Sequence, residues 1–450
     1  MVRKTIVLPV VIVLVFLALS VVCLVFADNS SLSSPVELQS NLPGEFGYSA
    51  YQLADGSLIL NTSNQTCTFL VKLDSSNRLM WAKPFQVNPI NTTLTRLRPT
   101  ADGGFVLAGI VDNLYTVVKT DSDGNITWTK TFSSGAPINY FQSIIQTRDG
   151  GFAIAGFGQL VDEGLGWIWF VKTDSAGNMA WNRTISGPLA DCPSSVFQMP
   201  NGDYVLSDVS YAFNPNHAFF RLVKLDALGN MLGSTVYGGD GYFYQPECNF
   251  AIATKDGGYL MAGYLWEKNA WVVKTDAEGN LQWNQTYGIK HSSITSAVET
   301  PNGGYLLLSI SNLTEVHLIM IDSEGTQVWK TTFPGVRLPV GLEASFNSII
   351  SSKDGGYIVV GSKNQSVWLV KLTPQSKSIV TSLELVVGLE LAVAVAVTLL
   401  FVAKKRRAGK TKALNIEAKQ KYEVSEKNSF CINNVRCNSR PIGSDYGSRF

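Results

Sequence analysis

The feature that most constrains the fold of this 450-residue chain is a short glycine turn that recurs seven times. Each copy opens with Asp-Gly or Asn-Gly and is followed by an apolar run with the composition of a β-strand. The glycine accepts the positive φ that a tight hairpin turn needs. The turns start at Asp55, Asp102, Asp149, Asn201, Asp256, Asn302 and Asp354, at intervals of 47, 47, 52, 55, 46 and 52 residues. Strand-rich units with a period of about 50 residues predict a propeller or another repeat array.

A second turn, also led by an aspartate, follows the first in six of the units. It starts at Asp74, Asp121, Asp174, Asp226, Asp276 and Asp322. In five of these units a tryptophan stands seven residues after the aspartate: Trp81, Trp128, Trp181, Trp283 and Trp329. In the fourth unit Gly233 takes that position. With the strand before each first turn, the pattern gives four strands per unit and no long stretch of helical period. We therefore predict an all-β fold, a closed seven-bladed β-propeller of four-stranded blades over residues 43–373.

The seventh unit is incomplete. Thr373 and Pro374 stand where its second turn would be, and no fourth strand follows. Residues 36–42 precede the first complete unit and have a strand-like composition. We predict that they supply the missing outer strand, because joining the first and last blades removes two exposed sheet edges.

Residues 1–27 have the pattern of a signal peptide. Arg3 and Lys4 precede a long apolar run, and Ala27 ends a sequence that suits cleavage. The run is long for a signal peptide, so an uncleaved anchor is the alternative. Either interpretation predicts that the ring is exported. Residues 28–42 form a polar lead-in that contains the proposed closing strand.

Residues 379–403 are predicted to form one transmembrane helix. Glu384 and Glu390 interrupt its outer half, and a run of four basic residues, 404–407, follows directly. The positive-inside rule therefore places the C-terminal end in the cytoplasm and the propeller outside, in a single-pass protein of the cell membrane. The tail, residues 404–450, has twelve basic and four acidic residues, a net charge of +8.

The basic tail is expected to be disordered and to contact anionic lipid headgroups. Nucleic acid is not expected as a partner, since no aromatic residues or recognisable fold accompany these charges. Cys431 and Cys437 lie six positions apart with no histidine nearby, which does not suit a zinc site.

The segment Val118–Trp128 (VKTDSDGNITW) resembles the tryptophan-docking repeat of quinoprotein-type propellers. In that family the tryptophan ring packs on the neighbouring blade. The spacing here has one residue fewer between the aspartate and the glycine than the family pattern. The chain is also similar to archaeal and bacterial cell-surface propeller repeat proteins. The resemblance covers the whole ring and implies a fold, but propellers host many functions.

Nine N-x-S/T sequons occur, all before residue 367, in agreement with an exported domain. They are at Asn29, Asn61, Asn64, Asn91, Asn125, Asn182, Asn284, Asn312 and Asn364. Cys192 and Cys248 stand at equivalent places in adjacent units, near the start of the innermost strand. A disulfide between them is expected in an oxidising exterior.

No cofactor, metal site or catalytic centre is expected. The turn sequence Asp121–Asn125 resembles the start of a calcium loop, but the distant bidentate glutamate is missing. Three histidines are scattered, and none is part of a recognisable nucleophile pattern, although spatial triads are not excluded by one sequence. A quinoprotein dehydrogenase is expected to carry a calcium pocket and often paired cysteines, and adjacent cysteines are absent here.

A partner is expected on the face of the ring that carries the longer, variable loops. Blades 3 to 5 have aromatic residues there, away from most sequons on that face. The candidate ligand-binding residues are Trp167, Tyr211, Phe213, His217, Tyr242, Phe243, Tyr244 and Trp266. The alternative is that these side chains pack under their own loops.

The sequence therefore favours a non-catalytic surface protein that binds cell-envelope glycan or protein. The alternatives are an extracellular enzyme with a pocket at the channel mouth and a purely structural envelope protein.

Overall fold

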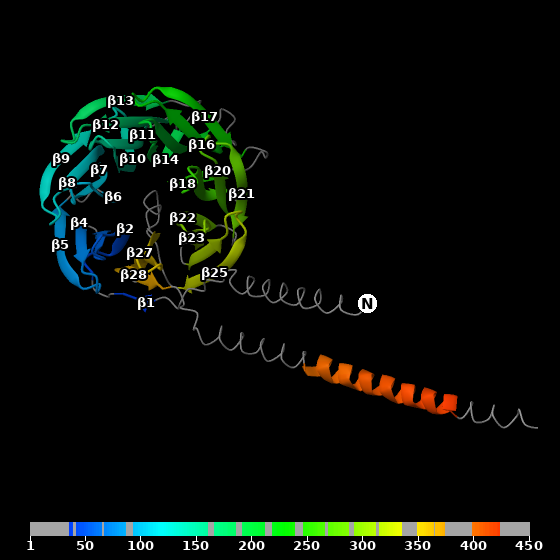
Figure 1. The fold of residues 1–450 in the computed structure, drawn as a ribbon. Helices are drawn as coiled ribbons and strands as arrows, with labels where there is room; N and C mark the ends of the chain where they lie inside the picture. The colour runs from blue at the N-terminus through cyan, green and yellow to red at the C-terminus, as the bar shows by residue number, and fades with distance from the viewer. Residues whose placement is uncertain are drawn as a thin grey trace, which may run out of the picture. The chain divides into compact units, whose positions relative to one another are not determined.

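A computed structural model describes the chain in two compact units, residues 1–375 and 376–450. The described residues are 36–38, 42–64, 67–86, 93–160, 166–185, 191–211, 218–238, 246–265, 269–287, 292–311, 315–334, 349–363, 365–373 and 398–423. In the first unit, seven four-stranded antiparallel sheets stand around one axis (Figure 1). In each sheet the strand that precedes the first glycine turn lies innermost. The fold is thus the predicted seven-bladed propeller.

Each sheet is one blade, built mostly from consecutive strands. Blade 1 comprises β2 (Phe46–Gln52), β3 (Leu58–Ser63), β4 (Cys67–Leu73) and β5 (Leu79–Gln86). Blade 2 comprises β6 (Thr93–Pro99), β7 (Phe105–Val111), β8 (Leu114–Thr120) and β9 (Ile126–Phe132). Blade 3 comprises β10 (Ile138–Gln146), β11 (Phe152–Gln159), β12 (Gly166–Thr173) and β13 (Met179–Ile185). Blade 4 comprises β14 (Asp191–Gln198), β15 (Tyr204–Tyr211), β16 (Ala218–Leu225) and β17 (Met231–Tyr237).

The remaining blades complete the ring. Blade 5 comprises β18 (Pro246–Ala253), β19 (Tyr259–Leu265), β20 (Ala270–Thr275) and β21 (Leu281–Tyr287). Blade 6 comprises β22 (Ser292–Glu299), β23 (Tyr305–Ser311), β24 (Glu315–Ile321) and β25 (Gln327–Pro334). Blade 7 comprises β26 (Ile349–Ser351), β27 (Tyr357–Lys363), β28 (Ser366–Leu372) and β1 (Val36–Glu37).

The closing strand of blade 7 comes from the other end of the repeat region. β1 pairs antiparallel with β28, with Val36 opposite Lys371. The amide of Leu38 adds a hydrogen bond to the Leu369 carbonyl at 2.9 Å. The predicted closure is therefore confirmed for residues 36–38. Of the predicted strand 36–42, residues 39–41 lie outside the described residues.

The core is divided among the seams between blades. Seven clusters of buried apolar residues are present, and each joins two neighbouring blades. One of them packs Leu58 and Leu60 of blade 1 against Ile358 and Val360 of blade 7. The inner strands are apolar on both faces because every blade is covered on both sides, which also explains their continuous apolar runs.

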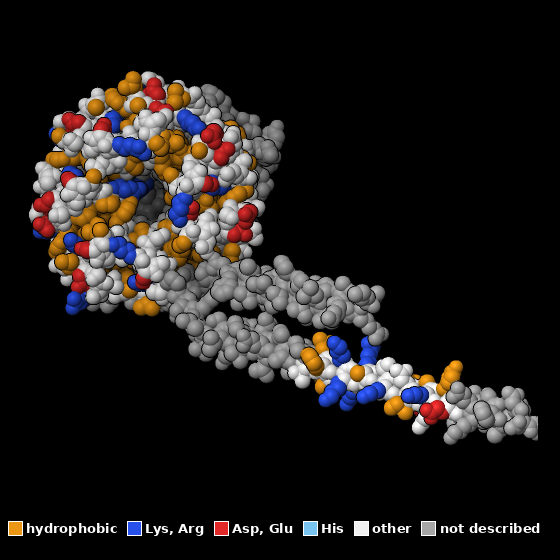
Figure 2. Space-filling view, viewed as in Figure 1, with side chains coloured by type: hydrophobic (Ala, Val, Ile, Leu, Met, Phe, Trp, Pro, Cys, Tyr) orange, Lys and Arg blue, Asp and Glu red, His pale blue; other side chains and the backbone are white. Residues whose placement is uncertain are grey.

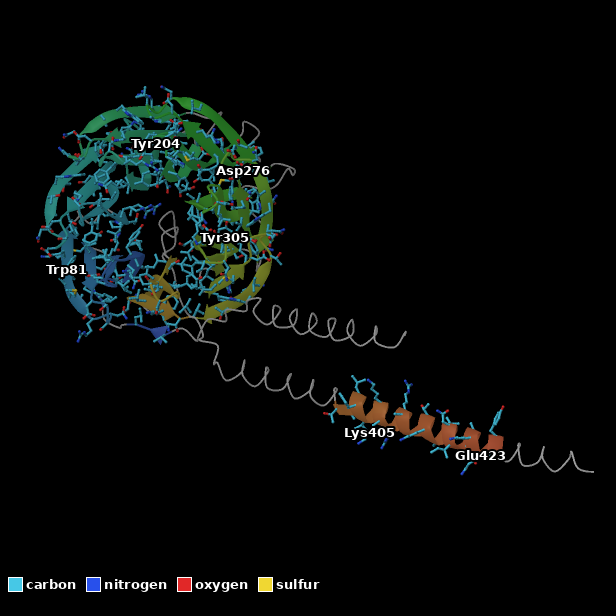
Figure 3. All side chains as sticks on the ribbon, in the orientation of Figure 1. Trp81, Tyr204, Asp276, Tyr305, Lys405 and Glu423 are labelled. Atoms are coloured by element: carbon cyan, nitrogen blue, oxygen red, sulfur yellow. The ribbon has the colours of Figure 1, made fainter. Side chains whose placement is uncertain are left out.

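Four of the five docking tryptophans pack against the second-turn glycine of the following blade. A Cβ added at Gly177, whose φ is +77°, would lie 2.8 Å from the Trp128 ring. The same packing joins Gly124 to Trp81, Gly229 to Trp181 and Gly325 to Trp283, where an added Cβ would lie 2.7 to 2.9 Å from the ring. Trp81 is labelled on the outer strand of blade 1 in Figure 3. The predicted docking role of these tryptophans is therefore present in the structure.

Blade 4, which has Gly233 in place of the tryptophan, uses a lysine instead. Lys224 donates from Nζ to the carbonyls of Ala277 and Glu278 in the second turn of blade 5, at 3.4 and 2.8 Å. In blade 5 the Nε1 of Trp283 donates to the equivalent carbonyl, that of Ser323, at 2.8 Å. Lys224 thus takes over the polar part of the tryptophan contact.

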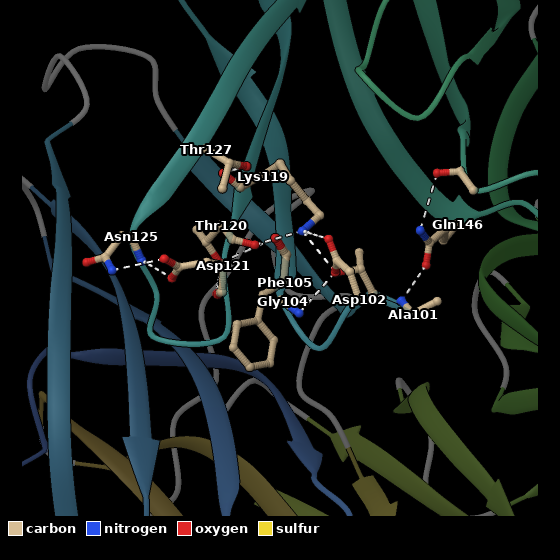
Figure 4. A network of polar contacts seen from close by, with 12 residues as sticks. Ala101, Asp102, Gly104, Phe105, Lys119, Thr120, Asp121, Asn125, Thr127 and Gln146 are labelled. Atoms are coloured by element: carbon tan, nitrogen blue, oxygen red, sulfur yellow. Dashed lines mark hydrogen bonds and ion pairs between the residues drawn. The ribbon is translucent and has the colours of Figure 1, made fainter.

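Lys224 is available because its usual partner is missing. In four other blades the equivalent lysine forms an ion pair with the first-turn aspartate. These pairs are Lys119–Asp102, Lys172–Asp149, Lys274–Asp256 and Lys371–Asp354, at 2.7 to 2.8 Å. Figure 4 shows the pair of blade 2. Blade 4 has Asn201 at the aspartate position, so its lysine is free to reach the next blade.

These four ion pairs predict an acid-labile component of stability. Burial opposes ionisation of Asp102, Asp149 and Asp256, yet hydrogen bonds from lysine, threonine and backbone outweigh it and lower each pKa to about 2. The Lys371 bond lowers the pKa of Asp354 to about 2 as well. A carboxylate with a lowered folded-state pKa stabilises the fold fully above about pH 4, its unfolded value, and loses this contribution towards pH 2.

We expect the Asp256→Asn variant to show a shallower fall in unfolding free energy between pH 4 and pH 2 than the parent chain. Urea unfolding at half-unit pH intervals measures this slope. Asn302→Ala is the matched control, since blade 6 has Met320 at the lysine position and no such pair. Equal slopes for Asp256→Asn and the parent would contradict the prediction.

A charged cluster is buried in blade 4. Arg221 of β16 donates to the Asp208 carboxylate of β15 and lies 2.9 Å from Asp191 of β14. Both aspartates are fully buried, and Arg221 is the described cation that faces them. Burial raises the pKa of Asp208, and Asp191 raises it further, against the opposing effect of Arg221. Asp208 shares its strand face with Leu206, which packs against blade 3.

The second unit contains a helix over residues 398–423, all of it exposed. Figure 3 labels Lys405 and Glu423 on it. The expectation of disorder is wrong for residues 404–423, whose sequence is rich in alanine, lysine and glutamate, all good helix formers. No helix among the described residues is long and apolar enough to span a membrane. Most of the predicted span, residues 379–397, and the signal segment lie outside the described residues.

Candidate functional site

The predicted aromatic patch is not brought together by the described part of the ring. Trp167 is half-buried in β12 and packs on the cluster between blades 2 and 3, so it supports that seam. Tyr211 is the last residue of β15. The other candidates lie outside the described residues: Phe213, His217, Tyr242, Phe243, Tyr244 and Trp266.

The sequons fall in different environments. Asn125, Asn182 and Asn284 are exposed, and Asn64 is half-buried after β3. The remaining positions, Asn29, Asn91, Asn312 and Asn364, lie outside the described residues.

Asn61 departs from the expectation that it is a glycosylated loop residue. It lies within β3, is fully buried, and donates from Nδ2 to the Leu94 carbonyl of blade 2 at 2.7 Å. This nitrogen is where an N-linked glycan attaches, so a glycan at Asn61 would have to replace this hydrogen bond. The use of this sequon stays a prediction.

The expected disulfide between Cys192 and Cys248 is not formed in the structure. Cys248 is a buried free thiol, with its sulfur 3.4 Å from the Ser194 hydroxyl and 3.5 Å from the Phe250 carbonyl. Burial raises the pKa of this thiol to about 12. β18 has a bulge directly after Cys248, and the sulfur contacts Ser194 of blade 4, a contact that the repeat spacing did not indicate.

His317 and Ser311 form a hydrogen-bonded pair that their spacing in the sequence did not reveal. His317 Nε2 lies 2.7 Å from the Ser311 hydroxyl, and Nδ1 lies 2.8 Å from the Thr332 hydroxyl. Burial, and then Lys330, lower the pKa of His317 and favour the neutral ring. Ser311 and His317 are 0% and 1% exposed, so the pair lies in the interior of blade 6 and is closed to substrate in this conformation.

The innermost strands enclose a cavity of about 220 Å³ on the propeller axis. All seven blades contribute to its wall. Blades 1 to 6 each present at least one polar side chain, namely Ser49, Thr95, Gln142, Ser194, Asn249 and Thr295, and blade 7 presents Ile349 and Ile350. Figure 2 shows the ring hollowed at its centre, with Lys and Arg side chains around the hollow.

β-Bulges place these polar residues. The innermost strand of each of blades 1 to 6 shifts register at the same place relative to its turn. A bulge leaves one residue out of the ladder and redirects side chains and amides. In three blades a serine then hydrogen-bonds to the next blade: Ser143 to the Val196 amide, Ser195 to the Ala251 amide and Ser296 to the Ile349 amide, at 2.9 to 3.3 Å.

Blade 2 has an arginine at the serine position. Arg96 donates from Nε to the Gln142 carbonyl of blade 3 and is 8% exposed. Arg98, two residues on, donates to the Tyr51 hydroxyl of blade 1 and stacks over its ring at 5.7 Å. Both arginines line the axial cavity. Sequence reasoning missed Arg96 and Arg98. The available signal was an arginine, Arg96, at a position where five of the other blades have serine in the sequence.

The fold and this axial cavity define a seven-bladed β-propeller with a polar central pocket. No protein-family profile matches the chain, and no curated protein matches it. Among solved structures, the ring is similar to a streptogramin B lyase, at 13% identity over 77% of this chain and 100% of that one, with a TM-score of 0.50. This likeness shows the fold alone.

Two further structures resemble the ring at lower scores. YCF48 from Cyanidioschyzon merolae matches at 10% identity over 76% of this chain and 100% of that one, with a TM-score of 0.47. A protein of unknown function from Bacteroides caccae matches at 13% identity over 64% and 93%, with a TM-score of 0.42. The propeller neighbours thus include a lyase and a protein without an assigned role, and they favour neither catalysis nor binding.

Proposed function

We propose that this chain is a membrane-anchored binding protein whose extracellular propeller holds a small polar ligand in the axial cavity. One observation carries the proposal: polar side chains from six blades converge on a single cavity of about 220 Å³. Pockets with a few convergent polar groups on a rigid scaffold are where propellers and other rings bind ligands.

Binding is favoured over turnover by the chemistry of the wall. Among its described residues are serines, threonines, amides and two arginines, but no histidine, carboxylate or thiol that could act as a general base. The second candidate function, an extracellular hydrolase, is favoured by the Ser311–His317 pair. That function requires the buried Ser311 and His317 side chains to become accessible to substrate.

Ligand binding to the full-length chain tests the proposal. Isothermal titration with glucose, N-acetylglucosamine, glycine, succinate and inorganic phosphate is expected to give one site for at least one probe. Gln142→Trp fills the cavity and should abolish that binding. Thr127→Trp, on the exposed face of β9, is the matched control and should bind as the parent does. Failure of all five probes, or equal binding by Gln142→Trp, would contradict the proposal.

The proposed topology has its own test. In a variant whose other cysteines, Cys67, Cys192 and Cys248 among them, are replaced by serine, Cys431 and Cys437 in the tail are expected to react with a membrane-impermeant maleimide only after cells are permeabilised. Labelling of intact cells would overturn the assignment of the tail to the cytoplasm.

The loop-face aromatics remain a proposed contact with envelope glycan or protein. Replacing Trp266, Tyr242 and Tyr244 together should weaken binding to envelope material if they form that contact.

A further inference from the structure

We propose that the outer strand of blade 4, β17, is the contact through which two copies of this chain pair edge to edge. Figure 1 shows β17 on the rim of the ring, between β13 and β21. It is the last strand of its sheet, so its outer edge pairs with no strand among the described residues. The described residues that line the axial cavity include none from β17, so this surface is separate from the proposed ligand site.

Blade 4 exposes more large apolar side chains than any other blade among the described residues. Met231, Leu232 and Val236 of β17 are 53%, 62% and 54% exposed, and Leu228 in the preceding turn is 62% exposed. Every other blade has one or two such side chains. In blades 2, 5 and 6 an acidic residue takes the place of Leu228. A contiguous apolar patch of this kind on a protein surface marks a site of contact.

Gly233 leaves the same patch open. In blades 1, 2, 3 and 5 a tryptophan at this position packs on the second-turn glycine of the next blade. A Cβ added at Gly233 would meet no atom within 4 Å. Glycine in a strand often marks a place where another backbone comes close. The outer edge of blade 4 therefore lacks the bulky ring that stands on the rim in those blades, and a second strand has room to approach.

The other complete outer strands carry features that oppose pairing with themselves. Charged side chains on an edge strand are a common protection against edge-to-edge association. The outer strands of blades 1, 2, 3 and 6 each have a lysine or an arginine, namely Lys83, Lys130, Arg183 and Lys330. β21 of blade 5 is uncharged but carries the Asn284 sequon. β17, with the sequence MLGSTVY, has neither a charge nor a sequon.

The sequence of β17 is complementary to itself, which identifies the partner as a second copy. Antiparallel pairing about a two-fold axis at Ser234 places Leu232 of each copy opposite Val236 of the other. Gly233 then lies opposite Thr235, and no like charges meet. Pairs of directly opposite side chains are what stabilise two adjoining strands. A partner of another kind would need an uncharged strand with the same apolar spacing, which a second copy supplies by symmetry.

Cross-linking at the two-fold axis tests the register. In the full-length chain with its native cysteines replaced by serine, Ser234→Cys is expected to give a covalent dimer with a short bismaleimide, because the two thiols lie opposite each other. Thr129→Cys, at the same place in β9, is the matched control and should remain monomeric. Ser234 and Thr129 are both exposed, so a maleimide with one reactive group should label the two variants equally.

Charge at the edge tests the contact without a cross-link. In sedimentation of the full-length chain over a concentration series, the parent is expected to reach twice the mass of one chain. Leu232→Lys with Val236→Lys places lysines opposite one another and should raise the dimer dissociation constant about tenfold or more. Leu232→Thr with Val236→Thr installs the residues of β9 and should weaken the dimer less. Thr127→Lys with Thr131→Lys, at the same positions in β9, should leave it unchanged.

Four results would overturn the inference. A parent chain that stays monomeric and forms no cross-link through Ser234→Cys would remove the contact. A dimer that is unaffected by the two lysines in β17 would place the contact elsewhere. Equal cross-linking of Thr129→Cys would indicate random collision. Cross-linking of Ser234→Cys to a different protein would assign the edge to another partner. Circular dichroism of each variant separates a loss of pairing from a loss of folding.

Discussion

Arg221→Met is expected to lower the free energy of unfolding by about 3–5 kcal/mol at pH 7.5, because it leaves two buried carboxylates without their cation. Asp191 and Asp208 are both fully buried, and Arg221 is the described basic group that bridges them. The loss should be smaller at pH 5. There Asp208, whose pKa burial already raises in the parent, takes up a proton and removes one of the facing charges.

Asp208→Asn separates charge from shape in the same cluster. This variant keeps the Arg221–Asp191 pair and removes the Asp208 carboxylate, whose charged form is disfavoured by burial. A carboxyl group with a raised folded-state pKa stabilises the fold fully below about pH 4 and loses that contribution as the pH rises through its folded value. The variant should therefore lose less stability at pH 7.5 than Arg221→Met. Urea unfolding at both pH values measures the difference, and equal losses for the two variants would contradict the charge argument.

Gly177→Ala should cost about 3 kcal/mol, the second largest effect, because two separate penalties act at this position. The backbone has a φ of +77°, which an L side chain adopts at a cost of about 1–2 kcal/mol. The new Cβ would also meet the Trp128 ring at 2.8 Å, so the docking contact between blades 2 and 3 must shift.

Gly103→Ala is the control that isolates the tryptophan contact. Its φ is +81°, but a Cβ there would have no atom within 4 Å. We expect it to cost only the backbone term, about 1 kcal/mol. Thermal and urea unfolding of both variants give the comparison. A cost for Gly103→Ala as large as that for Gly177→Ala would show that the ring contact adds nothing.

Most of the architecture was predictable because it repeats. The Asp-Gly turns fix the start of each second strand, and every one of their glycines has a positive φ in the structure. The resemblance to tryptophan-docking propellers implied contacts between neighbouring blades. The truncated seventh unit predicted that residues 36–42 close the ring, which is confirmed for residues 36–38.

The cavity and the buried charges were not predictable in the same way. Arg96 enters the cavity because a bulge in β6 shifts its register, and bulges depend on pairing rather than on composition. Asp191, Asp208 and Arg221 meet across three strands, each separated by more than ten residues. In blade 4, Asn201 replaces the aspartate that would pair with Lys224, and Gly233 replaces the docking tryptophan. Only the structure shows that the two changes are connected, because Lys224 bonds to the next blade.

Most of the side-chain contacts between blades described above have one direction, although Arg98 of blade 2 reaches back to Tyr51 of blade 1. Tryptophans 81, 128, 181 and 283, the serines at 143, 195 and 296, and Lys224 all reach from one blade to its successor in the chain. Damage to one repeat should therefore loosen the boundary after it more than the boundary before it. In a polypeptide emerging from the ribosome, each of these contacts can form only once the next sheet has been made. The strand that is synthesised first can pair only after the last sheet has been made.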